Sequence, residues 1–219
     1  MSDENKSRPQ ALSEAEKLDW LRLIRSDNVG PITFYKLLER FATARAALEA
    51  LPDLARHGGG KRLKVFSKAQ AEAEVEALER IGARLVSRGG PDYPPLLAHI
   101  EDAPPLIGVL GHAHLLAKKA IAVVGARNAS VNGCRFARKI AANLGQGGLL
   151  VVSGMARGID AAAHEGTIAT GTLAVLGGGL DVVYPKENST LYEKIVAEGA
   201  LISEVPPGAR PLARHFPRR

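Results

Sequence analysis

The sequence predicts an α/β fold in which a doubly wound parallel sheet follows a small, all-helical domain. From Ala120 onward, short apolar runs that end in small residues alternate with segments of helical periodicity. Before residue 82, in contrast, the apolar residues recur at helical spacing. With 46% hydrophobic residues in 219, the chain can build one sizeable core, and two domains are plausible.

The predicted helical domain spans residues 13–81 and follows a polar, mobile tail, residues 1–12. Ser67 with Gln70 three residues later is a capping-box start for the last helix. Val29-Gly30-Pro31 resembles the hairpin of helix-hairpin-helix DNA-binding modules, and a plain turn between helices explains it equally well. A loop is expected over 57–64, and helices are expected over 14–25, 33–41, 43–50 and 68–81.

Residues 82–119 are expected to connect the two domains. They contain Gly89-Gly90 and the proline-rich strings DYPPLL and DAPPLIGVLG. Because proline cannot donate a backbone hydrogen bond, these strings suit extended edge segments and turns better than a central strand.

Residues 120–219 predict the sheet domain. Buried parallel strands read as continuous apolar runs rather than as alternation, and strands that alternate with helices imply right-handed βαβ units. The domain is therefore expected to be Rossmann-like. Its strands are expected over 120–125, 149–154, 172–179 and 200–205, and its helices over 131–145, 158–169 and 191–199.

Composition excludes several classes of protein. No stretch approaches the ~20 apolar residues of a membrane span, and the polar N-terminus lacks a secretory core, so a cytoplasmic location is expected. The single cysteine, Cys134, forms no internal disulfide and is expected to pack on a helix. No zinc-ligand spacing occurs.

The net charge of +6 is a weak guide to a polyanionic partner. Residues 1–80 carry 14 Lys+Arg against 13 Asp+Glu, and residues 81–219 carry 15 against 10. Four of those 15 are Arg210, Arg214, Arg218 and Arg219, in the last ten residues. A nucleic-acid site must therefore be argued from placed residues rather than from bulk charge.

Three glycine-rich loops are expected at one edge of the sheet, where ligands of such folds bind. They are GARNAS (125–130), SGMARG (153–158) and LGGGLD (176–181). Backbone N–H groups and positive helix ends together favour phosphate there. Arg127 and Arg157 lie inside two of the loops, and Lys186 follows the third, so these three cations are expected to hold an anion.

The loops do not match the common nucleotide fingerprints. Arg127 stands where the second glycine of GxGxxG belongs, Ser153-Gly154 stands where a ribose-binding acid would end the second strand, and GxxxxGK[ST] is missing. No cofactor is therefore expected. Aromatic residues make up 5%, so a long base-stacking platform is not expected either.

Several structural interpretations compete with the functional ones. Glycine at a strand-to-helix turn is often purely geometric. Asp160 is expected to cap its helix or to interact with the helix dipole, rather than to act as a catalytic carboxylate. Asp160 and His164, four residues apart, favour a hydrogen-bonded structural pair over a general-base pair. Glu204 ends a strand, where it either faces the site or forms a salt bridge.

The loops, followed by LAVLGGGLDVVYPKEN, GALISEVPPG and HFPRR, closely resemble the DNA-processing protein A (DprA, or Smf) family. The resemblance covers roughly residues 15–219, and it implies that the helical domain is similar to a sterile-alpha-motif (SAM-like) module. Family sequences continue past FPRR with further strands, and many end in a winged helix. This chain stops at Arg219, so an edge of the sheet and part of a dimer surface are expected to be missing.

The resemblance implies a non-enzymatic protein that binds and protects single-stranded DNA during natural transformation. It also implies loading of the RecA recombinase and a homodimer formed through the Rossmann-like domain. In the family, the arginine that matches Arg127 and the lysine that matches Lys186 contact DNA phosphates. The candidate DNA-binding residues are Gly125, Ala126, Arg127, Ser130, Ser153, Gly154, Met155, Arg157, Gly158, Gly177, Gly178, Gly179, Lys186, Asn188 and Arg218.

Two other classes of function compete with DNA binding. A nucleoside-monophosphate phosphoribohydrolase has a similar Gly-Ser/Ala-Arg turn, but it also carries a Pro-Gly-Gly-x-Gly-Thr loop. Here that loop reads Gly177-Gly178-Gly179-Leu180-Asp181, which argues against it. A nucleotide-sensing protein without DNA binding is the other alternative.

Overall fold

The computed structural model describes residues 12–57 and 63–219, and the chain forms two compact units. The first contains Met1–Glu76 with Val86–Leu106, and the second contains Ala77–Leu85 with Ile107–Arg219. Residues 1–11 of the predicted tail (1–12) and residues 58–62 of the predicted loop (57–64) lie outside the described residues. Each unit is described by itself.

The first unit is built on helices. They are α1 (Glu14–Arg25), α2 (Pro31–Phe41), α3 (Ala44–His57) and α4 (Lys68–Arg80), the last of which runs on into the second unit. Ser67 and Gln70 exchange side-chain-to-backbone hydrogen bonds of 3.0 and 3.1 Å, so the predicted capping box is confirmed. The core centres on the fully buried Phe34, against which Trp20 packs edge-on.

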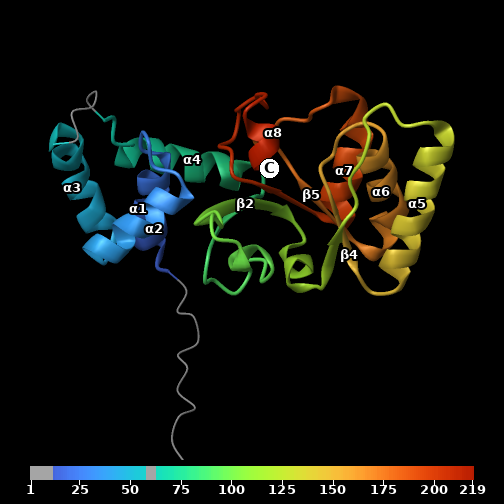
Figure 1. Ribbon diagram of the computed structural model, residues 1–219, viewed down its shortest axis with the longest axis horizontal. Coiled ribbons are helices and arrows are strands. Elements are labelled where there is room, and N and C mark those ends of the chain that lie inside the picture. Colours follow the sequence, from blue (N-terminus) through green and yellow to red (C-terminus); the bar gives the residue numbers. More distant parts are fainter. Residues whose placement is uncertain (1–11, 58–62) are drawn as a thin grey trace, which may run out of the picture. The chain divides into compact units, whose positions relative to one another are not determined.

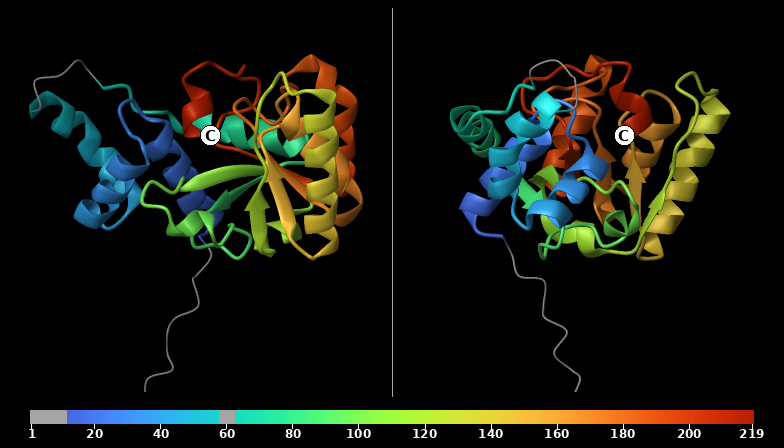
Figure 2. Two further views of the ribbon diagram at one scale, coloured as in Figure 1. Left: turned by 45° about the vertical axis from the view of Figure 1, so that its right-hand side comes forward. Right: turned by 60° about the vertical axis from the view of Figure 1, so that its left-hand side comes forward.

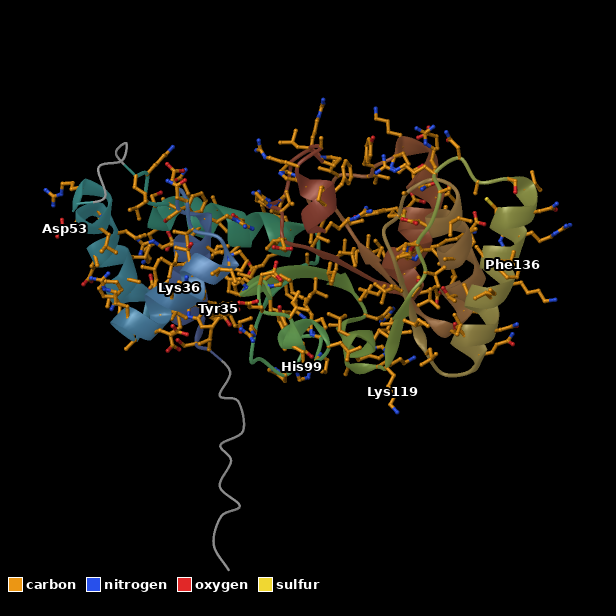
Figure 3. The ribbon with its side chains drawn as sticks, viewed as in Figure 1. Tyr35, Lys36, Asp53, His99, Lys119 and Phe136 are labelled. Atoms are coloured by element: carbon orange, nitrogen blue, oxygen red, sulfur yellow. The ribbon has the colours of Figure 1, made fainter. Side chains whose placement is uncertain are left out.

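The segment 86–106 packs on these helices through Tyr35, which Figure 3 labels. The Tyr35 hydroxyl donates a 3.0 Å hydrogen bond to the Ala103 carbonyl, and the Arg88 guanidinium lies 4.7 Å from the centre of the ring. About half of the predicted connector thus belongs to the helical unit, because residues 86–106 contact its helices.

The sheet contains six strands in the order β1-β2-β6-β5-β4-β3. Strands β3 to β6 are parallel, and β2 runs antiparallel to β6 with Val109 opposite Ile202. The strands are β1 (Arg84–Ser87), β2 (Leu106–Gly111), β3 (Ala120–Ala122), β4 (Leu150–Ser153), β5 (Thr172–Val175) and β6 (Ala200–Ser203). The predicted Rossmann-like α/β fold is confirmed.

The helices that link the parallel strands are α5 (Val131–Gln146), α6 (Ile159–Thr167) and α7 (Ser189–Glu198). Figure 1 shows them side by side, and α6 packs against both neighbours. The parallel strands follow one another in sequence order, so within residues 12–57 and 63–219 the sheet winds in a single direction. Right-handed crossovers in one direction place the linking helices on the same face of the sheet (Figure 2).

The predicted connector (82–119) contributes more regular structure than expected. Its strand β2 lies between β1 and β6, which is an interior position, and its prolines fall outside that strand. Interior pairing is possible because LIGVLG itself keeps every backbone donor. The short helices of the chain are η1 (Leu97–His99), η2 (Ala113–Ala117), η3 (Ile168–Thr170), η4 (Lys186–Asn188) and α8 (His215–Arg218).

The core of the second unit lies between the sheet and its helices. Leu180, Ile195 and Leu201 are fully buried there, and a smaller cluster around Val151 and Ala163 packs under α5. In the part of the chain that the structure describes, no helix has the length and apolar character to cross a membrane.

Candidate functional site

The candidate site is a pocket at the carboxyl ends of the parallel strands. Loops 123–130, 154–158 and 176–188 follow β3, β4 and β5, and the segment around α8 lies beside them. Sheets of this kind bind ligands at this edge. The pocket is lined by Arg127, Gly154, Ala156, Arg157, Leu176, Gly177, Gly178, Val182, Tyr184, Pro185, Pro211, Phe216 and Arg219.

Two arginines share one aromatic ring in this pocket. The Arg127 guanidinium carbon lies 5.1 Å from the centre of the Phe216 ring, and that of Arg219 lies 5.5 Å from it. The π-face attracts each cation and orients the flat guanidinium group. Arg219 is fixed further, because its Nη1 donates a 2.6 Å hydrogen bond to the Gly154 carbonyl. Arg127 of the first loop and Arg219 of the C-terminal segment thus meet at one ring, and Arg219 also contacts the second loop at Gly154.

The charges around Arg219 make the pocket favourable for an anion. Burial lowers the pKa of the Arg219 guanidinium, the Asp160 carboxylate raises it, and the positive charge of Arg127 lowers it again. The two arginines therefore lie close enough to repel each other. An anion bound between them relieves that repulsion and accepts their N–H groups.

Neighbouring carboxylates only partly offset these cations. Asp160 is buried in the first turn of α6, where its charge complements the helix dipole, and its Oδ2 accepts a 3.4 Å hydrogen bond from the Ala156 N–H, which precedes the helix. Arg157 lies 3.6 Å from Glu187, but both side chains are more than half exposed. An exposed pair of this kind is worth little, so Arg157 stays available to a ligand.

The glycines of the first two loops are required by packing. Gly158 has φ +74°, and a Cβ there would contact the Ala126 carbonyl oxygen. A Cβ on Gly125 would come within 2.7 Å of the Ile159 side chain. These contacts bring the Arg127 loop against the start of α6. These glycines are therefore needed for close packing, as the structural interpretation expects, and this packing positions Arg127.

The third loop is buried rather than open. Gly177, Gly178 and Gly179 are all buried, and Cβ atoms on them would contact Phe216, Pro211 and the Pro206 carbonyl respectively. Residues 206–216 thus cover the loop that the sequence predicts to be an open, glycine-rich phosphate site. Of its three glycines, Gly177 and Gly178 line the pocket and Gly179 does not.

The predicted residues fall into two groups. Arg127, Gly154, Arg157, Gly177 and Gly178 line the pocket. The others lie beside it: Gly125, Ala126, Gly158 and Gly179 in the loop backbones, and Lys186 exposed at the start of η4. The side chain of Arg218 lies outside the described residues.

Four predicted residues use their side chains for structure. Ser130 caps α5 by accepting a 3.1 Å hydrogen bond from the Gly133 N–H, and the Ser153 hydroxyl donates to the Val123 carbonyl at 2.6 Å. Met155 is buried in the core. The Asn188 amide donates to the Met155 carbonyl at 3.0 Å, which ties the second loop to η4.

The predicted hydrogen bond between His164 and Asp160 is wrong, because His164 pairs with another residue. Its Nδ1 lies 2.8 Å from the Thr172 hydroxyl on β5, and its Nε2 has no hydrogen-bond partner in the described part of the chain. The ring is fully buried, so it has no access to a ligand. The prediction rested on the four-residue spacing, which places both residues on one side of a helix. In the folded chain α6 packs so that the His164 side chain reaches the sheet instead.

Reasoning from the sequence missed Tyr184 and Phe216 and left Arg219 unplaced. The low content of aromatic residues, 5%, argued against an aromatic contribution to the site. A local signal was present, because each ring stands next to the basic residues of its own motif, YPKEN and HFPRR. Only the folded chain shows that these two motifs meet, with the rings 6.2 Å apart.

Comparison with known proteins agrees with this fold. The family model described as DNA recombination-mediator protein A matches residues 84–219, and the one described as a DprA-like N-terminal HHH domain matches residues 14–77. Protein Smf of Synechocystis is 32% identical over 95% of this chain and 56% of its own length. The DNA processing protein DprA of Streptococcus pneumoniae is 43% identical over 58% of this chain and 45% of its own length.

Two solved structures are similar to the chain. The X-ray structure of DprA from Streptococcus pneumoniae matches with a TM-score of 0.72 and 30% identity, covering 95% of this chain and 73% of that one. DNA processing protein A from Helicobacter pylori matches with a TM-score of 0.56 over 61% of this chain and 60% of that one. At 24% identity, the second likeness concerns the fold alone.

The fold and the pocket define a Rossmann-like α/β protein with an arginine-lined site at the carboxyl edge of its sheet. With both family models matched, the chain belongs to the DNA recombination-mediator protein A (DprA/Smf) family. It spans about half the length of the curated relatives it matches.

Proposed function

We propose that this chain binds single-stranded DNA through its backbone phosphates, with a phosphate held in the Arg127–Arg219 pocket. The observation that carries the proposal is the pair of guanidinium groups over Phe216. A similar fold, that of DNA processing protein A from Helicobacter pylori, is described as having a single-stranded DNA binding mode. No catalytic role is proposed for any residue.

The geometry favours a strand over a free nucleotide for two reasons. Arg127 and Arg157 are exposed on different loops, so they can reach successive phosphates of an extended backbone. The buried third loop leaves no glycine cradle of the kind that wraps a pyrophosphate. Phosphate contacts of this type carry little sequence information, so the binding is expected to tolerate any sequence.

The Arg127→Ala variant is expected to lose single-strand affinity by roughly tenfold, since one charge-assisted phosphate contact is removed. The slope of log affinity against log salt is expected to flatten by about 0.7, the value for one phosphate on a single strand. The Lys186→Ala variant is expected to show a smaller change of the same kind, because Lys186 is exposed beside the pocket rather than lining it. Anisotropy titrations of a labelled ~20-mer over a salt series measure both quantities.

Lys119→Ala is the matched control for charge. Lys119 is exposed just before β3, at the amino end of the strand and so at the opposite edge of the sheet (Figure 3). Its removal is expected to leave the affinity for single-stranded DNA within about twofold of the wild-type value. If Arg127→Ala and Lys119→Ala behave alike, or if duplex DNA competes as well as single strand, the site assignment is wrong.

The same proposal includes a location in the cytoplasm, RecA loading during natural transformation, and a homodimer formed through the Rossmann-like domain. The dimer has support on the surface. Strand β3 is at an edge of the sheet, and apolar side chains on it and on α5 are exposed, including Phe136, which Figure 3 labels. The exposed set is Ile121 on β3, Val124 just after that strand, and Val131, Phe136 and Ile140 on α5. Large apolar side chains exposed on an edge strand and on the helix that follows it are typical of an interaction site.

Self-association is expected to depend on this surface. Replacing Phe136, which is 66% exposed, by Glu is expected to shift a concentration-dependent dimer toward monomer by tenfold or more in the dissociation constant. Sedimentation equilibrium of the wild type and the variant measures the shift. A wild type that stays monomeric at high concentration, or a variant that dimerises unchanged, contradicts this interface.

A further inference from the structure

Tyr184 is the one pocket residue, among those described, that presents a large exposed ring. It is 51% exposed, while the neighbouring Pro185 is buried and anchors the backbone beside it. Its ring centre lies 6.2 Å from that of Phe216, with the two planes inclined by 34°. The ring therefore borders the cluster that holds Arg127 and Arg219.

The two rings are used differently. Phe216 lies under the guanidinium groups of Arg127 and Arg219, at 5.1 and 5.5 Å, so its π-surface is engaged with cations. Tyr184 carries no such cation contact in the described structure, and half of its surface faces solvent. Exposed tyrosine of this kind offers a flat apolar surface to a ligand.

We propose that Tyr184 stacks on a nucleobase of the strand whose phosphate occupies the Arg127–Arg219 pocket. The inference rests on the proposed function. A nucleotide has an anionic part and a flat aromatic part a short distance apart, and the pocket supplies cations together with an exposed ring. Every base has a π-face, so such stacking adds affinity without selecting a sequence.

Stacking and phosphate binding leave different signatures. The phosphate contacts weaken with salt, since they release counterions. The contact between uncharged rings does not change the number of phosphates neutralised, so it contributes equally at low and high salt. An abasic strand keeps every phosphate and lacks only the bases, which makes it the direct probe of Tyr184.

The test compares a ~20-mer oligo-dT with an abasic strand of equal length, by anisotropy titration over a salt series, using the full chain. The wild type is expected to bind oligo-dT roughly tenfold more tightly than the abasic strand, the effect of stacking about one base. Tyr184→Ala is expected to remove that preference and to keep the salt slope. Tyr184→Phe is expected to keep the preference, since the ring is retained.

Leu96→Ala is the matched control, because Leu96 is a large apolar side chain, 61% exposed, that lies outside both the pocket and the proposed dimer surface. It is expected to keep the full preference for oligo-dT. A Tyr184→Ala protein that still prefers oligo-dT, or one whose salt slope changes with its affinity, overturns the stacking role while DNA binding stands. A wild type that binds neither strand overturns the proposed function itself, and with it this inference.

Discussion

Acidification from pH 7 to pH 4 is expected to cost the α/β unit about 3 kcal/mol of stability through His164 alone. Burial lowers the pKa of this imidazole from 6.5 to about 4. A folded-state pKa below the unfolded value means that the stabilisation is complete above pH 6.5 and is lost as the pH falls toward 4. The size follows from the difference between a pKa of 6.5 in the unfolded chain and about 4 in the folded protein, evaluated at pH 4.

The hydrogen bonds around His164 explain the direction. The Thr172 hydroxyl donates its only proton to the Val151 carbonyl at 3.0 Å, so it can only accept from His164 Nδ1. Nδ1 therefore carries the proton of the neutral ring, and Nε2 is a bare, buried acceptor without a partner in the described structure. Protonating Nε2 places a charge and an unsatisfied donor in the core.

The His164→Asn variant tests this. Its amide can still donate to Thr172, while the titrating ring is gone. Chemical denaturation from pH 7 to pH 4 is expected to show the wild type losing about 3 kcal/mol more than the variant. Far-UV circular dichroism at pH 7 serves as the check that both proteins are folded. Stability curves that run parallel down to pH 4 contradict a neutral, buried His164.

The Gly158→Ala substitution is expected to destabilise the same unit by about 3 kcal/mol or more. Gly158 has φ +74° and ψ −122°, a conformation available essentially to glycine alone. The new Cβ would also contact the Ala126 carbonyl and come within 2.8 Å of the Arg127 carbonyl. Because both are backbone atoms, the first loop must move, and Arg127 moves with it.

Gly148→Ala separates strain from contact. Gly148 also has a positive φ, +85°, but a Cβ there meets nothing within 4 Å. Its cost is therefore the backbone preference, about 1–2 kcal/mol. Denaturation measures both variants, and DNA titration is expected to show a loss for Gly158→Ala only. Equal losses of stability in the two variants would mean that the loop contact is unimportant.

The fold was largely predictable because its signals are local. Each parallel strand from β3 to β6 is a short apolar run. Strands β4, β5 and β6 are mostly buried and show no alternation to misread, while β3 is an exposed edge strand. The helix starts at Ser13 and Ser67 carry their caps within three residues. Strand β2 was not predicted, because the prolines that flank LIGVLG are also typical of turns.

The candidate site was predictable only in part, since its chemistry combines distant segments. Arg127 could be singled out from its own loop. Its contact with the Phe216 ring joins residues 89 positions apart in the sequence, and no periodicity or motif predicts a contact over that separation. The same holds for Arg219 and the Gly154 carbonyl, 65 positions apart.

The sequence by itself determined the strand-to-helix order, the three loops at the sheet edge and the cations inside them, because each depends on neighbouring residues. The tertiary structure decided which of these loops are open. Residues 206–216 cover Gly177-Gly178-Gly179, and α6 packing turns His164 to β5 rather than to Asp160. It also brought Phe216 under two arginines and left the Tyr184 ring exposed beside them. Burial and cation–π contact are properties of surfaces in three dimensions, and they exist only once separate segments have packed.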